Sequence, residues 1–252
     1  MSVLKSIGID SSVFLSNSVS LEDNGRYKVV VGAYNVNSLN GTYYIMSDTV
    51  REVYEPNSVL QQRVKGGDVK SELNHPPFLP GMDVTTYLER LMTIEESNVC
   101  NIITELKLDS TPTKIPGHAD KMFLVKAIIE PYGEKANELK ASLDNSNSNT
   151  AYSVRGLNYS KEMNGMLYKE IHTVNTYDFV KNPGISVAKK SEWSKLSLES
   201  VSTDLSSRDI DSILNRLDAR DQIATEAESM FIKQVRDSII GCDDNSCIYK
   251  VW

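Results

Sequence analysis

The succession of strand-like and helix-like segments constrains the fold of this chain most strongly. Segments rich in β-branched and aromatic residues predict strands at 27–36, 98–108, 122–131, 150–160 and 172–180. Residues 47–64 tolerate a helix and residues 132–143 are good helix formers, and the polar run "DNSNSN" separates the second of these segments from the strand that follows. Strands and helices therefore mix without strict alternation, which predicts an α+β fold.

The composition changes after about Lys190. Residues 191–205 are rich in serine and lack apolar periodicity, so we interpret them as a linker between a domain at 1–190 and a tail at 206–252. Ser206 and Asp209 form a plausible helix start. Apolar residues then recur at helical spacing, at Ile210, Ile213, Leu214, Leu217, Ala224, Ala227, Phe231 and Val235. Such a stripe is typical of a helix that docks on a protein surface.

Charge and residue counts exclude several classes of protein. Lys and Arg total 27 against 34 Asp and Glu, a net charge of -7, and no basic run could follow a phosphate backbone. We therefore expect no nucleic-acid partner. No segment approaches the ~20 apolar residues of a membrane span, and the first residues lack a signal-like core, so we expect no membrane association.

Cofactor chemistry has little support in the sequence. The three cysteines, Cys100, Cys242 and Cys247, form no metal-ligand pattern and suit a reducing compartment. The three histidines are scattered, and "KGGD" fits neither nucleotide-binding pattern. We expect no metal and no organic cofactor.

His75 lies in the segment "SELNHPP", residues 71–77. Pro76 restricts the residue before it to extended conformations, so the imidazole is attached to a constrained backbone. This rigidity suits a general base, a ligand or a packed loop corner. A serine hydrolase needs a hydroxyl, an imidazole and a third group that orients the imidazole. The motif G-x-S-x-G is absent, which argues against an α/β-hydrolase.

Three short motifs in the same order resemble a known family. "ELNHP" at 72–76 resembles the histidine motif of the prohead maturation proteases of tailed bacteriophages. "AYSVRGL" at 151–157 resembles their serine motif, small-x-Ser-x-Arg-Gly, and "DFVKNPGISVA" at 178–188 resembles their "DxVxxPxxxA" segment. The resemblance covers roughly residues 27–188 and is patchy between the motifs.

The resemblance implies a serine endopeptidase related to the herpesvirus assemblins, with a β-barrel flanked by helices and, here, a C-terminal helical tail. His75 would be the general base and Ser153 the nucleophile. Asp178 would be the third member, with His172 as the alternative, because the assemblins use a histidine there. Arg155 and Gly156 would support the oxyanion. A homodimer, as in the assemblins, stays open.

The resemblance also implies substrates. Such proteases cut scaffold or core proteins, the major capsid protein and themselves after Glu in small-x-Glu sites, within the prohead in the host cytoplasm. Tripeptides of this kind end at Glu22, Glu138, Glu162, Glu199 and Glu226. We predict self-cleavage after Glu199, in the linker, with Glu226 and Glu22 as secondary sites. The alternatives are a non-enzymatic capsid core or scaffold component that retains the fold and, less favoured, an unrelated esterase.

Overall fold

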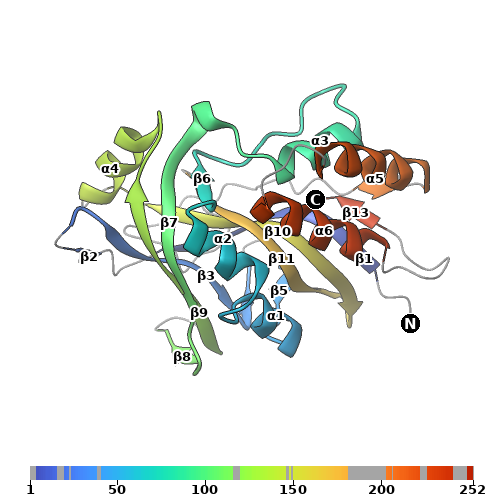
Figure 1. Ribbon diagram of the computed structural model, residues 1–252. Coiled ribbons are helices and arrows are strands. Elements are labelled where there is room, and N and C mark those ends of the chain that lie inside the picture. The colour runs from blue at the N-terminus through green and yellow to red at the C-terminus, as the bar shows by residue number, and fades with distance from the viewer. Residues whose placement is uncertain are drawn as a thin grey trace.

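The computed structural model describes residues 4–15, 20–22, 24–38, 41–115, 120–145, 148, 150–180, 203–205, 207–221, 226–240 and 249–251. Their strands form two curled sheets with helices packed around them (Figure 1). The mixed α+β architecture predicted from the sequence is confirmed. None of the described helices has the length and apolar character needed to cross a membrane.

The first sheet is built on a long hairpin of β10 (Ala151–Met163) and β11 (Met166–Val180). Asn164 and Gly165 connect the strands with φ of 53° and 74°, the paired positive values that favour Asn-Gly in a tight hairpin turn. β1 (Leu4–Leu15) pairs antiparallel with the free side of β10. The strand order is β12-β13-β1-β10-β11-β5-β4, where β12 is Thr203–Leu205, β13 is Tyr249–Val251, β5 is Tyr43–Tyr44 and β4 is Val36–Asn37.

The second sheet has the order β2-β3-β9-β7-β6. Its strands are β2 (Ser20–Leu21), β3 (Tyr27–Tyr34), β9 (Lys121–Pro131), β7 (Val99–Leu108) and β6 (Lys70–Glu72), with β8 (Thr113–Lys114) paired to β9. The chain leaving β6 joins the two sheets, because Leu73 forms a parallel bridge with Phe179 of β11. The Asn74 N–H also donates to the Phe179 carbonyl, at 2.6 Å. This junction brings the histidine motif to the end of β11.

Helices cover the sheets and their edges (Figure 1). They are α1 (Asp48–Val53), α2 (Val59–Gly66), α3 (Val84–Met92), the 3-10 turn η1 (Glu96–Asn98), α4 (Ala136–Asp144), α5 (Ser207–Asp221) and α6 (Glu226–Ile240). Side chains of Ser47, Ser58 and Asp83 cap the first turns of α1, α2 and α3. α5 packs on α3 and α6, and α6 packs on α2, so the C-terminal helices lie against the helices of the first part of the chain.

Several predicted elements need correction in their extent. β11 begins at Met166 rather than at His172, because the hairpin turn at Asn164 and Gly165 was not recognised. β1 was not predicted, because its sequence has neither strict alternation nor a continuous apolar run. The predicted apolar stripe of the tail is divided between α5 and α6, and Ala224 lies outside the described residues. The last three residues of the predicted linker form β12. The rest of the linker lies outside the described residues.

Candidate active site

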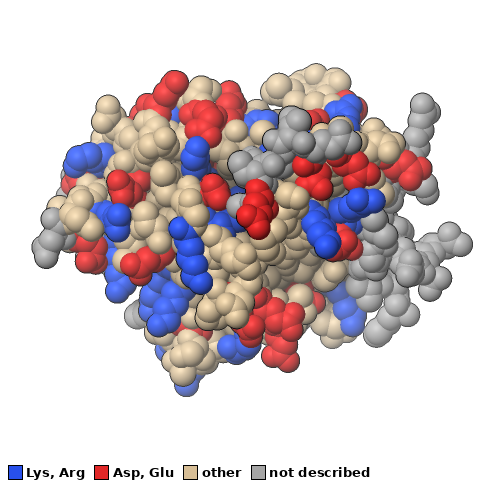
Figure 2. All heavy atoms as spheres, viewed as in Figure 1, with Lys and Arg blue, Asp and Glu red and all other residues tan. Residues whose placement is uncertain are grey.

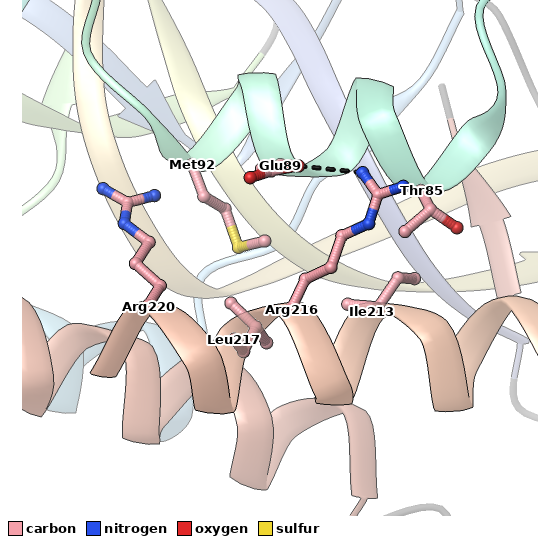
Figure 3. A pocket seen from close by; sticks show the side chains of 7 residues that line it. All are labelled: Thr85, Glu89, Met92, Ile213, Arg216, Leu217 and Arg220. Atoms are coloured by element: carbon pink, nitrogen blue, oxygen red, sulfur yellow. Dashed lines mark hydrogen bonds and ion pairs between the residues drawn. The ribbon is translucent and has the colours of Figure 1, made fainter. Parts of the chain in front are cut away.

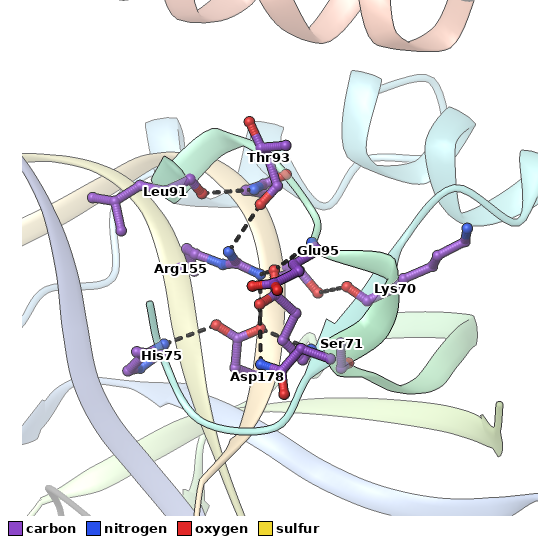
Figure 4. Close-up of polar contacts among 12 residues, drawn as sticks. Lys70, Ser71, His75, Leu91, Thr93, Glu95, Arg155 and Asp178 are labelled. Atoms are coloured by element: carbon purple, nitrogen blue, oxygen red, sulfur yellow. Dashed lines mark hydrogen bonds and ion pairs between the residues drawn. The ribbon is translucent and has the colours of Figure 1, made fainter. Parts of the chain in front are cut away.

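The structure holds His75 in the loop that follows β6. Asn74 has φ of 63°, in the left-handed region that asparagine tolerates better than most residues. The backbone therefore turns sharply at Asn74, and the following proline restricts His75 itself. The His75 ring faces β11, and its Nδ1 lies 2.8 Å from Oδ2 of Asp178 (Figure 4). The structure thus brings together two residues that are 103 positions apart in the chain.

Ser153 lies directly opposite Asp178 in the register of β10 and β11. Directly opposed residues of an antiparallel pair point to the same face of the sheet, with Cβ atoms about 5 Å apart. Both side chains are fully buried. His75 Nε2 is buried as well and has no hydrogen-bond partner among the described residues. A carboxylate, an imidazole with an open nitrogen and a hydroxyl on the carboxylate's face are the groups that a serine hydrolase requires.

Asp178 is held by donors on both of its oxygens. Oδ2 contacts His75, whereas Oδ1 accepts the backbone N–H of Glu72 at 3.0 Å and Nη2 of Arg155 at 2.9 Å. These contacts come from β6 and β10, which flank β11 and its junction with the second sheet. The carboxylate that faces His75 therefore has a fixed orientation, and a neutral His75 that donates from Nδ1 leaves Nε2 free to accept a proton.

The Arg155 side chain is buried in the core of this site, where its guanidinium donates hydrogen bonds. Besides Asp178, the guanidinium donates to Oε1 of Glu72 at 3.0 Å and to the Thr93 carbonyl at 3.2 Å. Arg155 is 1% exposed. Figure 4 shows its guanidinium between Thr93 and Asp178. These contacts place the Arg155 side chain behind Asp178, where it supports the carboxylate.

Glu72 and Arg90 complete the network. Glu72 is fully buried and forms a two-pronged ion pair with Arg90, at 3.0 Å to Oε1 and 2.5 Å to Oε2. Burial raises the pKa of the Glu72 carboxyl, but the hydrogen bonds from Arg90 and the charge of Arg155 outweigh it and lower that pKa to about 2. The hydrogen bond to Glu72 in turn raises the pKa of Arg90. At neutral pH the site thus contains a buried carboxylate beside two guanidinium groups.

Gly156 lets β10 and β11 approach each other next to the site. A Cβ added at Gly156 would lie 2.1 Å from the Thr173 carbonyl oxygen. The register of the two strands shifts on either side of this contact, between Arg155 and Gly156 and between Leu157 and Asn158. These irregularities are β-bulges, which redirect side chains.

His172 lies at the second of these shifts, away from the Asp178 end of β11. Its ring stacks on Tyr159, with centroids 4.2 Å apart, and its Nδ1 lies 3.1 Å from Oγ1 of Thr173. On an unbroken strand His172 and Asp178 would point to the same face of the sheet. The two bulges interrupt the alternation of side chains between these residues. The residue that contacts His75 is Asp178.

Cys100 is a weaker candidate for a nucleophile. Its thiol is buried and lies 3.3 Å from the Ser71 carbonyl oxygen. Burial raises the pKa of the thiol well above its usual range, which opposes formation of a thiolate. Among the described residues no group of three or more His, Cys, Asp or Glu side chains could hold a metal ion.

The C-terminal helices line two hollows beside the network. A small apolar pocket lies between α3 and α5, and its lining includes Arg216 and Glu89, which form an ion pair at 2.9 Å (Figure 3). A cavity of about 280 Å³ lies next to it, between Thr93 and Phe231. Arg220 of α5 donates to the Thr93 hydroxyl at 2.9 Å. On the face shown in Figure 2, basic and acidic side chains are interspersed.

Sequence analysis assigned no role to Glu72 or Arg90. Glu72 is part of the histidine motif, three residues before His75, and a charged residue inside a short motif was the available signal. Arg90 lies outside every motif. Its part depends on α3 packing beside β10, which local sequence does not reveal.

The chain is similar to known proteins over most of its length. Residues 16–242 match the Peptidase S80 family, and the chain belongs to that family. The capsid maturation protease of Pseudomonas phage phiKZ is 35% identical over 180 residues, which cover 69% of this chain and 63% of that protein. The chain thus aligns with less than two thirds of this relative's length. The structure of the bacteriophage T4 capsid assembly protease covers 71% of this chain and 94% of its own, at 15% identity and a TM-score of 0.41.

Proposed function

We propose that this protein is a serine endopeptidase that matures phage capsids, with Ser153 as nucleophile, His75 as general base and Asp178 as the third member. The observation that carries the proposal is the contact of His75 Nδ1 with Asp178 at 2.8 Å, beside a serine in register with Asp178. Membership of a peptidase family and similarity to a capsid maturation protease support it.

In the proposed reaction Ser153 Oγ attacks the carbonyl carbon of the scissile peptide while its proton passes to His75 Nε2. The tetrahedral intermediate collapses, the C–N bond breaks, and the same proton moves to the leaving amine. Water then hydrolyses the acyl-enzyme by the same proton transfers in reverse order. Asp178 stabilises the imidazolium that forms in each half-reaction, and Arg155 keeps Asp178 in place.

The proposed substrates are scaffold or core proteins and the major capsid protein, cut after Glu in small-x-Glu sites inside the prohead in the host cytoplasm. The name of the phiKZ relative supports capsid-related substrates. We also propose self-cleavage after Glu199, which lies outside the described residues. Glu22 and Glu226 are exposed in the structure and suit secondary cleavage.

A barrel of the assemblin type is part of the same proposal. Two junctions between the sheets support it: β6 meets β11 at the Leu73–Phe179 bridge, and β3 lies against β1 and β10. Sheets joined at two places enclose one core, in which Val31, Tyr44, Ile103 and Tyr177 are buried. A homodimer remains an open part of the proposal.

The experiment compares the intact mass of the wild-type chain with that of Ser153→Ala after equal incubation at high concentration, alone and with a scaffold or capsid substrate. Ser160→Ala is a matched control, because Ser160 is also a buried serine of β10. We expect cleavage after small-x-Glu sites in the wild type and in Ser160→Ala, and none in Ser153→Ala. Cleavage by all three proteins, or by none in the presence of substrate, contradicts the proposal and favours a structural capsid component.

A further inference from the structure

The Glu72 side chain accepts several hydrogen bonds close to the candidate triad. Its carboxylate accepts hydrogen bonds from the side chains of Arg90, Arg155 and Asn98 and from the backbone N–H of Glu95. The side chain has no exposed surface. A buried carboxylate of this kind is expensive to keep unless its partners compensate for lost hydration. The proposed chemistry assigns it no proton transfer and no contact with substrate.

Glu72 acts on Asp178 by two separate routes. Its backbone N–H donates directly to Asp178 Oδ1 at 3.0 Å. Its carboxylate, through Oε1, contacts the same Arg155 nitrogen that donates to Asp178 Oδ1. Arg155 Nη2 therefore bridges two carboxylates, and its position depends on both.

The charges of the network show why the second carboxylate matters. Arg155 and Arg90 carry two positive charges, and Glu72 and Asp178 carry two negative charges, so the four buried or partly buried groups balance. Without the Glu72 charge, Asp178 would be the one buried carboxylate of this network beside two guanidinium groups, because Glu95, which also pairs with Arg90, is exposed. Arg155, which already donates to Asp178 Oδ1, would then be free to turn toward Oδ2 and compete with His75 for the carboxylate.

We propose that Glu72 is a positioning residue of the active site: it holds Arg155 between two carboxylates, so that Asp178 stays oriented toward His75 Nδ1. Arg90 neutralises Glu72 from the far side. This inference rests on the proposed function, because it assigns Glu72 a part in orienting the general base. The histidine motif then supplies both the base and, three residues earlier, the group that orients the base's partner.

The test uses Glu72→Gln, which keeps the size of the side chain and one acceptor oxygen but removes the charge. Glu95→Gln is the matched control, because Glu95 also pairs with Arg90, at 3.0 Å, but has an exposed side chain. Steady-state cleavage of a small-x-Glu peptide gives kcat and KM. We expect Glu72→Gln to lower kcat by about 10- to 100-fold with KM within about threefold, because misplacement of a reacting group acts on the chemical step. Glu95→Gln should match the wild type.

A second readout does not depend on peptidase activity. In the Ser153→Ala background, the proton on His75 Nδ1 should give a low-field resonance in the proton NMR spectrum, since it is held by a carboxylate. We expect Glu72→Gln to shift or abolish this resonance and Glu95→Gln to leave it unchanged. An unchanged resonance in folded Glu72→Gln overturns the inference, even if the wild type proves to be a peptidase. An inactive wild type would contradict only the proposed function.

A double variant covers the case in which Glu72→Gln does not fold. Glu72→Gln combined with Arg90→Met removes one charge of each sign, which leaves Arg155 balanced by Asp178. This protein should fold and still show the lowered kcat and the altered resonance, because Arg155 is no longer shared. Full wild-type kcat in the double variant would show that Glu72 only balances charge, and would overturn the inference.

Discussion

Two histidines have different surroundings: His75 lies in the loop after β6 and contacts the end of β11, whereas His172 lies within β11. His75 contacts a buried carboxylate through Nδ1, and its Nε2 is buried without a partner among the described residues. His172 stacks on Tyr159, bonds to the neighbouring Thr173, and forms part of the wall of a cavity of about 300 Å³ beside α1 and α2. A candidate general base is thus distinguished by the hydrogen-bond network behind it, since the same type of side chain at His172 stacks on a tyrosine.

Replacing each histidine by alanine should separate their roles most clearly. In serine proteases loss of the histidine costs about 10⁶ in kcat. We expect His75→Ala to lose activity on this scale. We expect His172→Ala to stay within about tenfold of the wild type, because its ring stacks on Tyr159 at the bulge, away from the Asp178 end of β11. Peptide cleavage at equal concentrations of folded protein measures both. A comparable loss in His172→Ala would show that it is the third member.

Replacing Asp178 by Asn tests the partner of His75. The amide keeps the shape of the side chain but cannot hold the imidazole in the required tautomer, and the equivalent change in a serine protease costs about 10⁴ in kcat. We expect a loss of this size, smaller than that of His75→Ala. Asp109→Asn is a suitable control, because Asp109 pairs with Lys126 on the other sheet. Activity of Asp178→Asn within tenfold of the wild type would exclude Asp178 from the triad.

The network also predicts how stability depends on pH. Folding lowers the pKa of Glu72 from 4.5 to about 2, so its contribution to stability is fully present above about pH 4.5 and is lost as the pH falls toward 2. The shift corresponds to roughly 3 kcal/mol. Urea unfolding of Ser153→Ala at several pH values measures how the free energy of unfolding depends on pH. Between pH 4.5 and 2, the variant that also carries Glu72→Gln should lose less unfolding free energy than Ser153→Ala alone, by about this amount. The same pH dependence in both proteins would contradict the lowered pKa of Glu72.

Local sequence indicated the candidate site residues but not the network around them. Short motifs that resemble those of a known family predicted His75, Ser153 and Asp178, and the structure brings His75 and Asp178 into contact, with Ser153 in register with Asp178. The positions of Arg90 and Thr93 depend on how α3 packs against β10, which no local pattern encodes. The bulges of the hairpin were equally hidden, since each depends on the partner strand. The three long strands of the second sheet, β3, β7 and β9, were predicted well because their apolar runs are long, whereas the short strands β2, β6 and β8 were not predicted.

Replacing Gly156 tests how much the close approach of β10 and β11 contributes to the stability of the fold. Because an added Cβ would lie 2.1 Å from the Thr173 carbonyl oxygen, Gly156→Ala must move backbone. We expect a loss of about 2 kcal/mol in the free energy of unfolding, by the general cost of overpacking. Gly66→Ala is the control, since an added Cβ there meets only the flexible Asp68 carboxylate. If Gly156→Ala is as stable as the control, the strands separate easily at this point.

The smallest effect is expected where an ion pair is exposed. Arg216 and Glu89 join α5 to α3 at 2.9 Å, but their side chains are 44% and 50% exposed. Water screens such pairs, so a double-mutant cycle with Arg216→Met and Glu89→Gln should give a coupling of about 0.5 kcal/mol or less. The Arg90–Glu72 pair, with Glu72 fully buried, should give several times more in the same cycle. Equal couplings would mean that burial does not distinguish the network behind His75 from an ordinary surface contact. A small coupling energy between Arg216 and Glu89 would indicate that the C-terminal helices are held mainly by their apolar face, through Ile213 and Leu217.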